Sequence, residues 1–245
     1  MQYRIVLILC LLCLSNTLHA EREAFTLPNG DRYEGDFVDG ALSGSGVYQW
    51  ADGDRYEGQF SNDLPNGTGT YFWADGRRYD GEFVAGKRQG YGSLTWVNGD
   101  RYEGAFLANQ MHGEGTFLWG NGDRYEGDFI ANQRYGAGSM LWRGGQRYEG
   151  DFADDTMHGQ GIYRWPDGRL FKGSFFGGQR TGVGIFAAAD GTLFRGFFAG
   201  DQRHGLVVKQ LSNGERFFEV YSAGTLVESL RIAADSRCQF STLDG

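Results

Sequence analysis

Cysteine is scarce in this chain of 245 residues, which contains three. Cys10 and Cys13 lie in an apolar segment near the start, and each follows a leucine rather than the small residue that lipid attachment requires. Cys238 is then the one thiol left outside that segment, and a lone thiol provides neither an intramolecular disulfide framework nor a multi-cysteine metal site. The fold must therefore be held by strand pairing and packing, and whether Cys238 joins two chains stays open.

A long apolar run is also missing. The longest one, Ile5 to Leu14, is too short to cross a bilayer. It follows Arg4 and precedes a polar stretch that ends at Ala20, an order typical of an export signal with cleavage after Ala20. We therefore expect residues 1–20 to be a signal peptide and the protein to be periplasmic or secreted. The short signal favours a bacterial host.

Basic residues are fewer than acidic ones, with 23 Lys and Arg against 31 Asp and Glu. The net charge is −8, and loss of Arg4 with the signal gives −9 (22 basic, 31 acidic). This sign opposes binding to nucleic acid and to anionic lipid surfaces. A G-x-S-x-G elbow and an isolated Cys/His constellation are absent, and glycine pairs such as Gly113-Glu114-Gly115 lead into strands rather than into a helix N-terminus. The sequence predicts no catalytic residue, no cofactor and no metal.

A repeat of 23 residues is what the chain has in abundance. The segment GDRYEGDF at residues 30–37 returns almost unchanged at residues 53–60, 99–106 and 122–129. A fixed period of this length is the signature of a solenoid or array. Without insertion, the first aromatic column runs through Tyr33, Tyr56, Tyr79, Tyr102, Tyr125, Tyr148, Phe171, Phe194 and Phe217, and the tryptophan column through Trp50, Trp73, Trp96, Trp119, Trp142 and Trp165.

Each unit alternates in the manner of two strands. Over residues 32–37 the aromatic and glycine residues share one face, and Arg32 and Glu34 share the other; residues 44–50 alternate in the same way. Each unit is therefore predicted to be a β-hairpin. Because charge rows on one strand face are usually solvated, Arg32, Glu34 and their repeats are expected to form a ladder of screened pairs. The alternative is an acidic docking strip for a basic partner or divalent cations.

Turn dipeptides such as Asp52-Gly53 separate the units. A two-residue loop there would place Tyr48 and Tyr56 on opposite faces of the sheet. A three-residue loop over 51–53, with Gly53 left-handed at a bulge, pairs the two tyrosines and puts all the aromatics on one face. The other connection, over 37–44, is expected to be longer and polar.

The recurring pattern Y-x-G-x-[FW], a G-x-G pair, an aromatic residue and [ND]-G resembles the MORN (membrane occupation and recognition nexus) repeat over residues 25–221. The resemblance implies an all-β fold, an elongated, twisted, single-layer antiparallel meander of 23-residue hairpins. It also implies protein or lipid binding and scaffolding, not catalysis. We expect a MORN array over 21–224, with a half-unit at 24–30 and repeats from 31, and a cap and tail over 225–245. Residues 225–232 are expected to add a closing strand, with a short helix as the alternative.

A single-layer sheet has no second sheet to bury against, so rings are expected to lie over glycines, for example Tyr56 over Gly58 and Gly46. Part of the aromatic face then stays open, and exposed contiguous aromatics mark interaction surfaces. The alternative is that these rings only pack the sheet. The predicted binding residues on this face are Tyr56, Tyr79, Tyr102, Tyr125, Tyr148, Trp50, Trp73, Trp96, Trp119, Trp142 and Trp165.

Three histidines, His112, His158 and His204, follow the signal and share one column of the repeat. They are two units apart, a separation of roughly 19 Å in a sheet, which is too far for ligands of one metal. We predict that they are polar residues at loop ends.

The function predicted from these patterns is non-catalytic binding or scaffolding in the cell envelope or outside it, by contact with a protein partner or by self-association. One alternative is peripheral phospholipid binding, which the aromatic belt favours and the charge of −9 opposes. Another is glycan or cell-wall binding, because aromatic platforms stack on sugar rings. Nucleic acid is not an expected partner.

Overall fold

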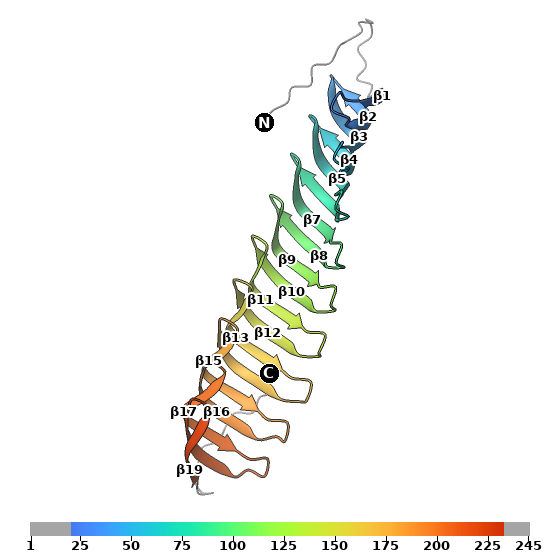
Figure 1. Cartoon of the computed structure of the whole chain (residues 1–245). Helices are drawn as coiled ribbons and strands as arrows, with labels where there is room; N and C mark the ends of the chain where they lie inside the picture. The colour runs from blue at the N-terminus through green and yellow to red at the C-terminus, as the bar shows by residue number, and fades with distance from the viewer. Residues whose placement is uncertain (1–20, 233–245) are drawn as a thin grey trace, which may run out of the picture. The chain divides into compact units, whose positions relative to one another are not determined.

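The computed structural model describes residues 21–232, so the expected signal peptide, Cys238 and the tail after 232 lie outside the described residues. All regular elements in this range are strands, and each pairs antiparallel with the next strand of its unit, as the all-β prediction required (Figure 1). A helix long and apolar enough to cross a membrane is absent from the same range. The chain divides into two compact units, 1–120 and 121–245, each an open meander of hairpins.

In the described part of the first unit, nine strands follow one another. The N-terminal strand places Phe25 opposite Tyr33, and it ends at Thr26, before Pro28. The strands are β1 (Glu21–Thr26), β2 (Arg32–Val38), β3 (Ala41–Gln49), β4 (Arg55–Ser61), β5 (Leu64–Phe72), β6 (Arg78–Val84), β7 (Lys87–Thr95), β8 (Arg101–Leu107) and β9 (Gln110–Leu118).

Ten strands make up the described part of the second unit. The last of them shows that residues 225–232 form the closing strand rather than the alternative helix. Its partner is the strand before it, with Ser222 opposite Thr225. The strands are β10 (Arg124–Ile130), β11 (Gln133–Leu141), β12 (Arg147–Ala153), β13 (Thr156–Arg164), β14 (Leu170–Phe176), β15 (Gln179–Ala187), β16 (Leu193–Ala199), β17 (Gln202–Gln210), β18 (Arg216–Ser222) and β19 (Thr225–Ile232).

The three-residue loop between repeats is confirmed. The N–H of Trp50 donates to the carbonyl of Asp54 at 2.9 Å, and the N–H of Gly53 donates back to the carbonyl of Trp50 at 3.1 Å. Gly53 has a φ of 102°, a value that glycine adopts without a steric penalty. As predicted, Tyr48 then lies opposite Tyr56, and one face of the sheet carries all the aromatic columns.

The prediction of a longer polar connection over 37–44 is wrong. β2 continues to Val38 and β3 begins at Ala41, which leaves a turn of two residues, Asp39 and Gly40, with φ values of 51° and 81°. Two left-handed residues define the hairpin turn that suits strand twist, and Asp39-Gly40 is one of the pairs that this turn prefers. Turns at the same place in other repeats begin with alanine, as in Ala85-Gly86 and Ala108-Asn109, so this signal does not recur regularly.

The tyrosine column forms the core of each sheet. Tyr56 has an exposed fraction of 0%. Its ring lies so close to two glycines that an added Cβ would come within 2.5 Å of its Oη at Gly58 and 2.3 Å at Gly69. The expected contact with Gly46 is therefore wrong, because the ring of Tyr33 covers that glycine. Each tyrosine covers the glycine pair of its own hairpin, toward which the side chain leans along the strand.

Phenylalanines complete this core by edge-to-face contacts. The ring of Tyr56 meets Phe60 of its own repeat at 5.1 Å and Phe83 of the next repeat at 5.0 Å, both nearly perpendicular. Tyr125 meets Phe129 and Phe152 in the same way in the second unit. Such pairs add about 0.5–1.5 kcal/mol beyond the area they bury. A single layer can thus bury whole rings, because successive repeats supply what a second sheet would otherwise provide.

Candidate binding face

The eleven residues predicted to bind a partner fall into two groups. The five tyrosines are fully buried, at 0% exposure, so they hold the sheet together and present no ring at the surface. The six tryptophans are half-buried and keep part of each indole at the surface. The accessible part of the predicted face is therefore the tryptophan column, which is formed by Trp50, Trp73, Trp96 and Trp119 in the first unit and by Trp142 and Trp165 in the second.

The tryptophans lie in rows of touching rings with a second aromatic column. In the first unit, Tyr48 lies 4.7 Å from Trp50, Trp50 lies 5.3 Å from Tyr71, and Tyr71 lies 4.6 Å from Trp73, measured between ring centroids. Farther along that unit the row runs from Trp96 to Phe117 to Trp119, and the second unit has a row from Trp142 through Tyr163 and Trp165 to Phe186. We call these rows the tryptophan rows.

The prediction omitted the partner rings, of which Tyr71, Phe117 and Tyr163 are examples. They stand two positions before Trp73, Trp119 and Trp165, on the same strand face, so the alternation could have identified them. Like the tryptophans they are half-buried. The candidate surface is therefore two columns wide rather than one.

Asp54, from the repeated GDRYEG segment, fixes one such row. Its Oδ2 accepts a hydrogen bond of 2.6 Å from Tyr71 Oη, and its Oδ1 accepts one of 2.8 Å from the N–H of Ala74, in the loop after Trp73. Burial raises the pKa of Tyr71, and the hydrogen bond to Asp54 raises it further. This tyrosine therefore stays neutral and continues to donate. The aspartate thus orients both the ring and the loop that flank Trp73.

Arginine guanidinium groups, which were not among the predicted binding residues, lie on the same face. In the first unit, Arg77 and Arg88 lie 4.8 Å and 5.5 Å from the ring centroid of Trp73. In the second unit, Arg169 and Arg180 flank Trp165 at 5.2 Å and 5.5 Å. The column that holds Arg88 and Arg180 varies from repeat to repeat between arginine, leucine, proline and methionine, so no regular pattern marked it.

The opposite face carries the predicted ladder of ion pairs. Arg101 reaches Glu103 of the same strand at 3.0 Å, and Arg147 reaches Glu149 at 2.8 Å, with side-chain exposures of 42–52%. Pairs this exposed contribute little to stability, about 0–1 kcal/mol each. The further members of this ladder are Arg55 with Glu57, Arg78 with Asp80, and Arg124 with Glu126.

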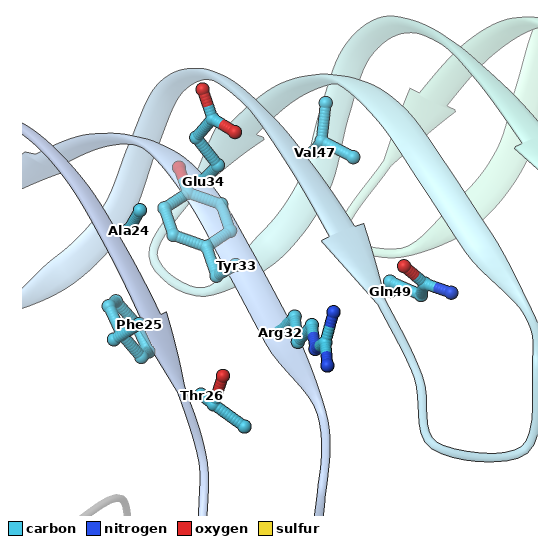
Figure 2. A pocket seen from close by; sticks show the side chains of 8 residues that line it. All are labelled: Ala24, Phe25, Thr26, Arg32, Tyr33, Glu34, Val47 and Gln49. Carbon is cyan, nitrogen blue, oxygen red and sulfur yellow. The ribbon is translucent and has the colours of Figure 1, made fainter.

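A hollow of about 390 Å³ lies over β1, β2 and β3 (Figure 2). It contains Arg32 and Glu34, the charged pair of the first repeat, beside apolar surface. One cation and one anion on an exposed strand face provide no concentrated charge. The residues that line it are Ala24, Phe25, Thr26, Arg32, Tyr33, Glu34, Val47 and Gln49.

The three histidines lie inside strands β9, β13 and β17 rather than at loop ends. His158 stands opposite Asp151 and lies 5.1 Å from the ring of Phe176, and His204 stands opposite Phe197. Over residues 21–232, no three His, Cys, Asp or Glu side chains gather where they could hold a metal ion.

Comparison with known proteins adds a family but no close relative. No curated protein matches the sequence. Among solved structures, the chain is similar to the TCP domain of SAS-4 (dCPAP) in complex with a proline-rich motif of Ana2 (dSTIL) of Drosophila melanogaster, with 14% identity, 59% of this chain and 84% of that chain covered, and a TM-score of 0.33. A variant of the TCP10 domain of Danio rerio CPAP covers 86% of this chain and 99% of its own, at 14% identity and a TM-score of 0.30.

A virginiamycin B lyase from Staphylococcus aureus gives 12% identity, 85% and 72% coverage, and a TM-score of 0.17. Scores this low carry no argument about fold or function. The MORN repeat, in contrast, matches seven successive segments that cover most of the chain, at residues 33–55, 56–77, 79–101, 102–124, 125–147, 148–168 and 171–193. The chain therefore belongs to the MORN-repeat family.

Proposed function

We propose that this protein is a non-catalytic binding protein that holds a protein segment, or a second copy of itself, against its tryptophan rows. The observation that carries the proposal is the half-burial of those rows: rings such as Trp50 and Tyr71 are ordered by neighbours at 4.6–5.3 Å yet keep an accessible face. Rigid, partly exposed aromatic rings lose little conformational entropy on binding and are frequent anchors of protein interfaces.

Protein is favoured over the other ligands by what surrounds the tryptophans. Guanidinium groups lie over the rings of Trp73 and Trp165 and occupy ring faces on which a sugar would stack. These groups also bring hydrogen-bond donors that suit backbone carbonyls and carboxylates. The net charge of −8 opposes attraction to an anionic bilayer. Glycan and phospholipid binding are therefore treated as outcomes of the test.

We further propose that the protein acts in the cell envelope or outside the cell. The support is the arrangement over residues 1–20, where Arg4 precedes an apolar run and a polar stretch that ends at Ala20. Detecting the protein in periplasmic or culture fractions, with the chain beginning at residue 21, tests this part of the proposal. A chain that keeps residues 1–20 and stays in the cytosol would overturn it.

The first test of the binding face is light scattering coupled to size exclusion. We expect the purified chain to run as a dimer, and the double variant Trp96→Ala, Trp119→Ala to run as a folded monomer, because these two tryptophans sandwich Phe117 in one row. Circular dichroism checks that the variant is folded. The matched control is Arg101→Ala, Glu103→Ala on the opposite face, which should leave the dimer unchanged.

A dimer that survives the tryptophan double variant would contradict self-association through this face. A wild-type chain that runs as a monomer would also contradict self-association. A segment of another protein would then be the proposed occupant of the tryptophan rows. That occupant should then be captured by the wild type and not by the tryptophan variant. Binding of wall fragments, or of zwitterionic vesicles, with the same dependence on Trp96 and Trp119 would replace protein by glycan or lipid as the ligand.

A further inference from the structure

Two arginine guanidinium groups lie near the Trp73 ring in the first unit. Arg77, in the loop before β6, lies 4.8 Å from the ring centroid, and Arg88, on β7, lies 5.5 Å from it. Arg88 also lies over Tyr79 at 5.6 Å and Phe106 at 5.4 Å. Two cations and a half-buried indole therefore meet at one place on the binding face.

The second unit contains the same three residue types in the same columns, namely Trp165, Arg169 and Arg180. There each arginine has its own carboxylate. Arg169 Nε lies 2.7 Å from Asp167 Oδ2, and Arg180 Nε lies 2.9 Å from Asp201 Oδ1. The four charges of this cluster cancel.

The first unit lacks one of these carboxylates. Arg77 pairs with Asp75 at 2.8 Å, but Asn109 occupies the position that Asp201 has beside Arg180. The N–H of Arg88 donates to Asn109 Oδ1 at 2.9 Å, and its guanidinium donates to the Asn109 carbonyl at 2.7 Å. Between residues 21 and 232, no carboxylate forms an ion pair with Arg88. The cluster therefore keeps one uncompensated positive charge in a protein of net charge −8.

This charge is partly withdrawn from water. Burial lowers the pKa of the Arg88 guanidinium, and the neighbouring charge of Arg77 also lowers it. The group stays protonated at neutral pH, because an arginine in a protein hardly ever loses its proton. A desolvated cation without an anion is unfavourable, so an external anion that reached it would gain from the contact.

We infer that Arg77, Trp73 and Arg88 form a subsite for a carboxylate side chain, glutamate or aspartate, of an extended protein segment. This inference rests on the proposed function, since the segment is the one that lies on the tryptophan rows. The second unit indicates the ligand chemistry, because Asp201 supplies a carboxylate to the equivalent arginine there. The planar guanidinium fork matches a carboxylate in two hydrogen bonds.

Arg203 shows what the subsite needs in addition to a free cation. It too has no ion pair in the described range, but its guanidinium lies 4.1 Å from the ring centroid of Phe194 and 4.6 Å from that of Tyr221. Ala188 and Thr192 occupy the places of the tryptophan and the second arginine. The combination of an accessible indole and two cations, one of them without a carboxylate, is therefore found at Trp73 within residues 21–232.

The experiment is an NMR titration of the isotope-labelled chain with glutamate blocked at both its amino and carboxyl ends. The signals followed are the Nε–H of Arg88 and Arg180 and the indole N–H of Trp73 and Trp165. We expect saturable shifts at Arg88 and Trp73, with dissociation in the millimolar range typical of a single ion contact. Arg180 and Trp165 should move little, and blocked glutamine should shift none of the four.

Reciprocal substitutions exchange the two clusters. Asn109→Asp places a carboxylate beside Arg88 and should weaken binding of blocked glutamate about tenfold. Asp201→Asn removes the carboxylate beside Arg180 and should create the same titration at Arg180 and Trp165. Both positions are exposed turn residues with similar φ values, 75° and 68°, so both variants should fold.

Equal shifts at the two clusters, or an unchanged titration in Asn109→Asp, would overturn the inference. Inorganic phosphate binding more tightly than blocked glutamate would replace the carboxylate by a phosphate. The result is separable from the proposed function. If blocked glutamate binds at Arg88 while the Trp96 and Trp119 variant keeps every association of the wild type, the subsite stands and the proposed face fails.

Discussion

The hydroxyl of Tyr56 donates a hydrogen bond of 3.0 Å to the backbone carbonyl of Gln59, three residues later on the same strand. The register between β4 and β5 shifts at Gln59, because Gly58 lies opposite Gly69 whereas Phe60 lies opposite Pro65, so that one residue of β4 faces three of β5. Gln59 therefore has no ladder partner in β5, and the tyrosine supplies a donor to its carbonyl. Five more tyrosines do the same in their repeats: Tyr33, Tyr79, Tyr102, Tyr125 and Tyr148.

Removal of this hydroxyl should destabilise the sheet without emptying its core. We expect Tyr56→Phe to lower the free energy of unfolding by about 1 kcal/mol, the usual cost of a buried hydrogen bond. Urea denaturation followed by circular dichroism measures it. Phe171 is a natural comparison, because its ring is equally buried over a glycine pair without a hydroxyl.

Phe171→Tyr should therefore be neutral or stabilising, with the new hydroxyl directed at the Ser174 carbonyl. If both substitutions lowered stability equally, the hydroxyl would not be the group that matters. The ring alone would then account for the column.

The glycines under the tyrosines should tolerate no side chain. A Cβ on Gly69 would lie 2.3 Å from Tyr56 Oη and 2.5 Å from its Cζ, and the ring is held by neighbours on both sides. We expect Gly69→Ala to cost at least about 3 kcal/mol, since overpacking of a rigid core costs about 1–3 kcal/mol or more. Thermal unfolding measures the loss.

Gly144→Ala is the matched control for this substitution. Its Cβ would meet only the mobile end of Gln146, at 2.4 Å, and its φ is not left-handed. A change below about 0.5 kcal/mol is expected at such a surface position. If Gly69→Ala and Gly144→Ala lowered the free energy of unfolding by similar amounts, the glycines beneath the tyrosines would be needed for their backbone conformation rather than for the space that the ring occupies.

The register of this fold could be predicted from sequence, because the alternation of side chains between the two faces of a strand allows only one loop length. With side chains alternating at period two, only a three-residue loop puts Tyr48 and Tyr56 on one face, and the structure has that loop. The glycine that each tyrosine covers could not be predicted in the same way. Gly46 and Gly69 both lie opposite Gly58, on its two neighbouring strands. The alternation does not say in which direction the side chain of Tyr56 leans, and this direction places its ring over Gly69.

The candidate site was predictable only where it repeats. The tryptophan column recurs every 23 residues and was found, whereas Arg88 stands in a column that holds Leu42 and Pro65 in the preceding repeats. Its partner Asn109 lies 21 residues later, in a two-residue turn that the sequence pattern did not reveal. Contacts between a variable column and an unpredicted turn become visible only once the hairpins are closed.

Those turns provide a test of their own. Ala85 has a φ of 48°, a left-handed value that alanine adopts at a cost of about 1 kcal/mol. Ala85→Asn would create the Asn-Gly pair that this turn type prefers, so we expect the free energy of unfolding to rise by about 0.5–1 kcal/mol. Chemical denaturation measures the gain. Ala74→Asn, in a three-residue loop and without a left-handed φ, should change it little, and an equal gain there would contradict the turn assignment.

Alkaline pH should unfold the sheets through their tyrosines. Burial raises the pKa of Tyr56 and Tyr79 to about 12, from 10.0 when exposed. The folded chain holds these protons at a pH where the unfolded chain releases them. Stability is therefore complete below pH 10 and falls as pH rises toward 12. At pH 11 each such tyrosine should lower the free energy of unfolding by about 1 kcal/mol.

The double variant Tyr56→Phe, Tyr79→Phe isolates this effect, because the variant and the wild type share every lysine and all the remaining tyrosines. Urea denaturation at a series of pH values gives the slope for each protein, and the absorbance of tyrosinate shows whether ionisation accompanies unfolding. The variant should start less stable at neutral pH and lose stability less steeply between pH 10 and pH 12. Equal slopes would mean that these hydroxyls ionise within the folded sheet, which would contradict their burial beneath the rings of Phe60, Phe83 and Phe106.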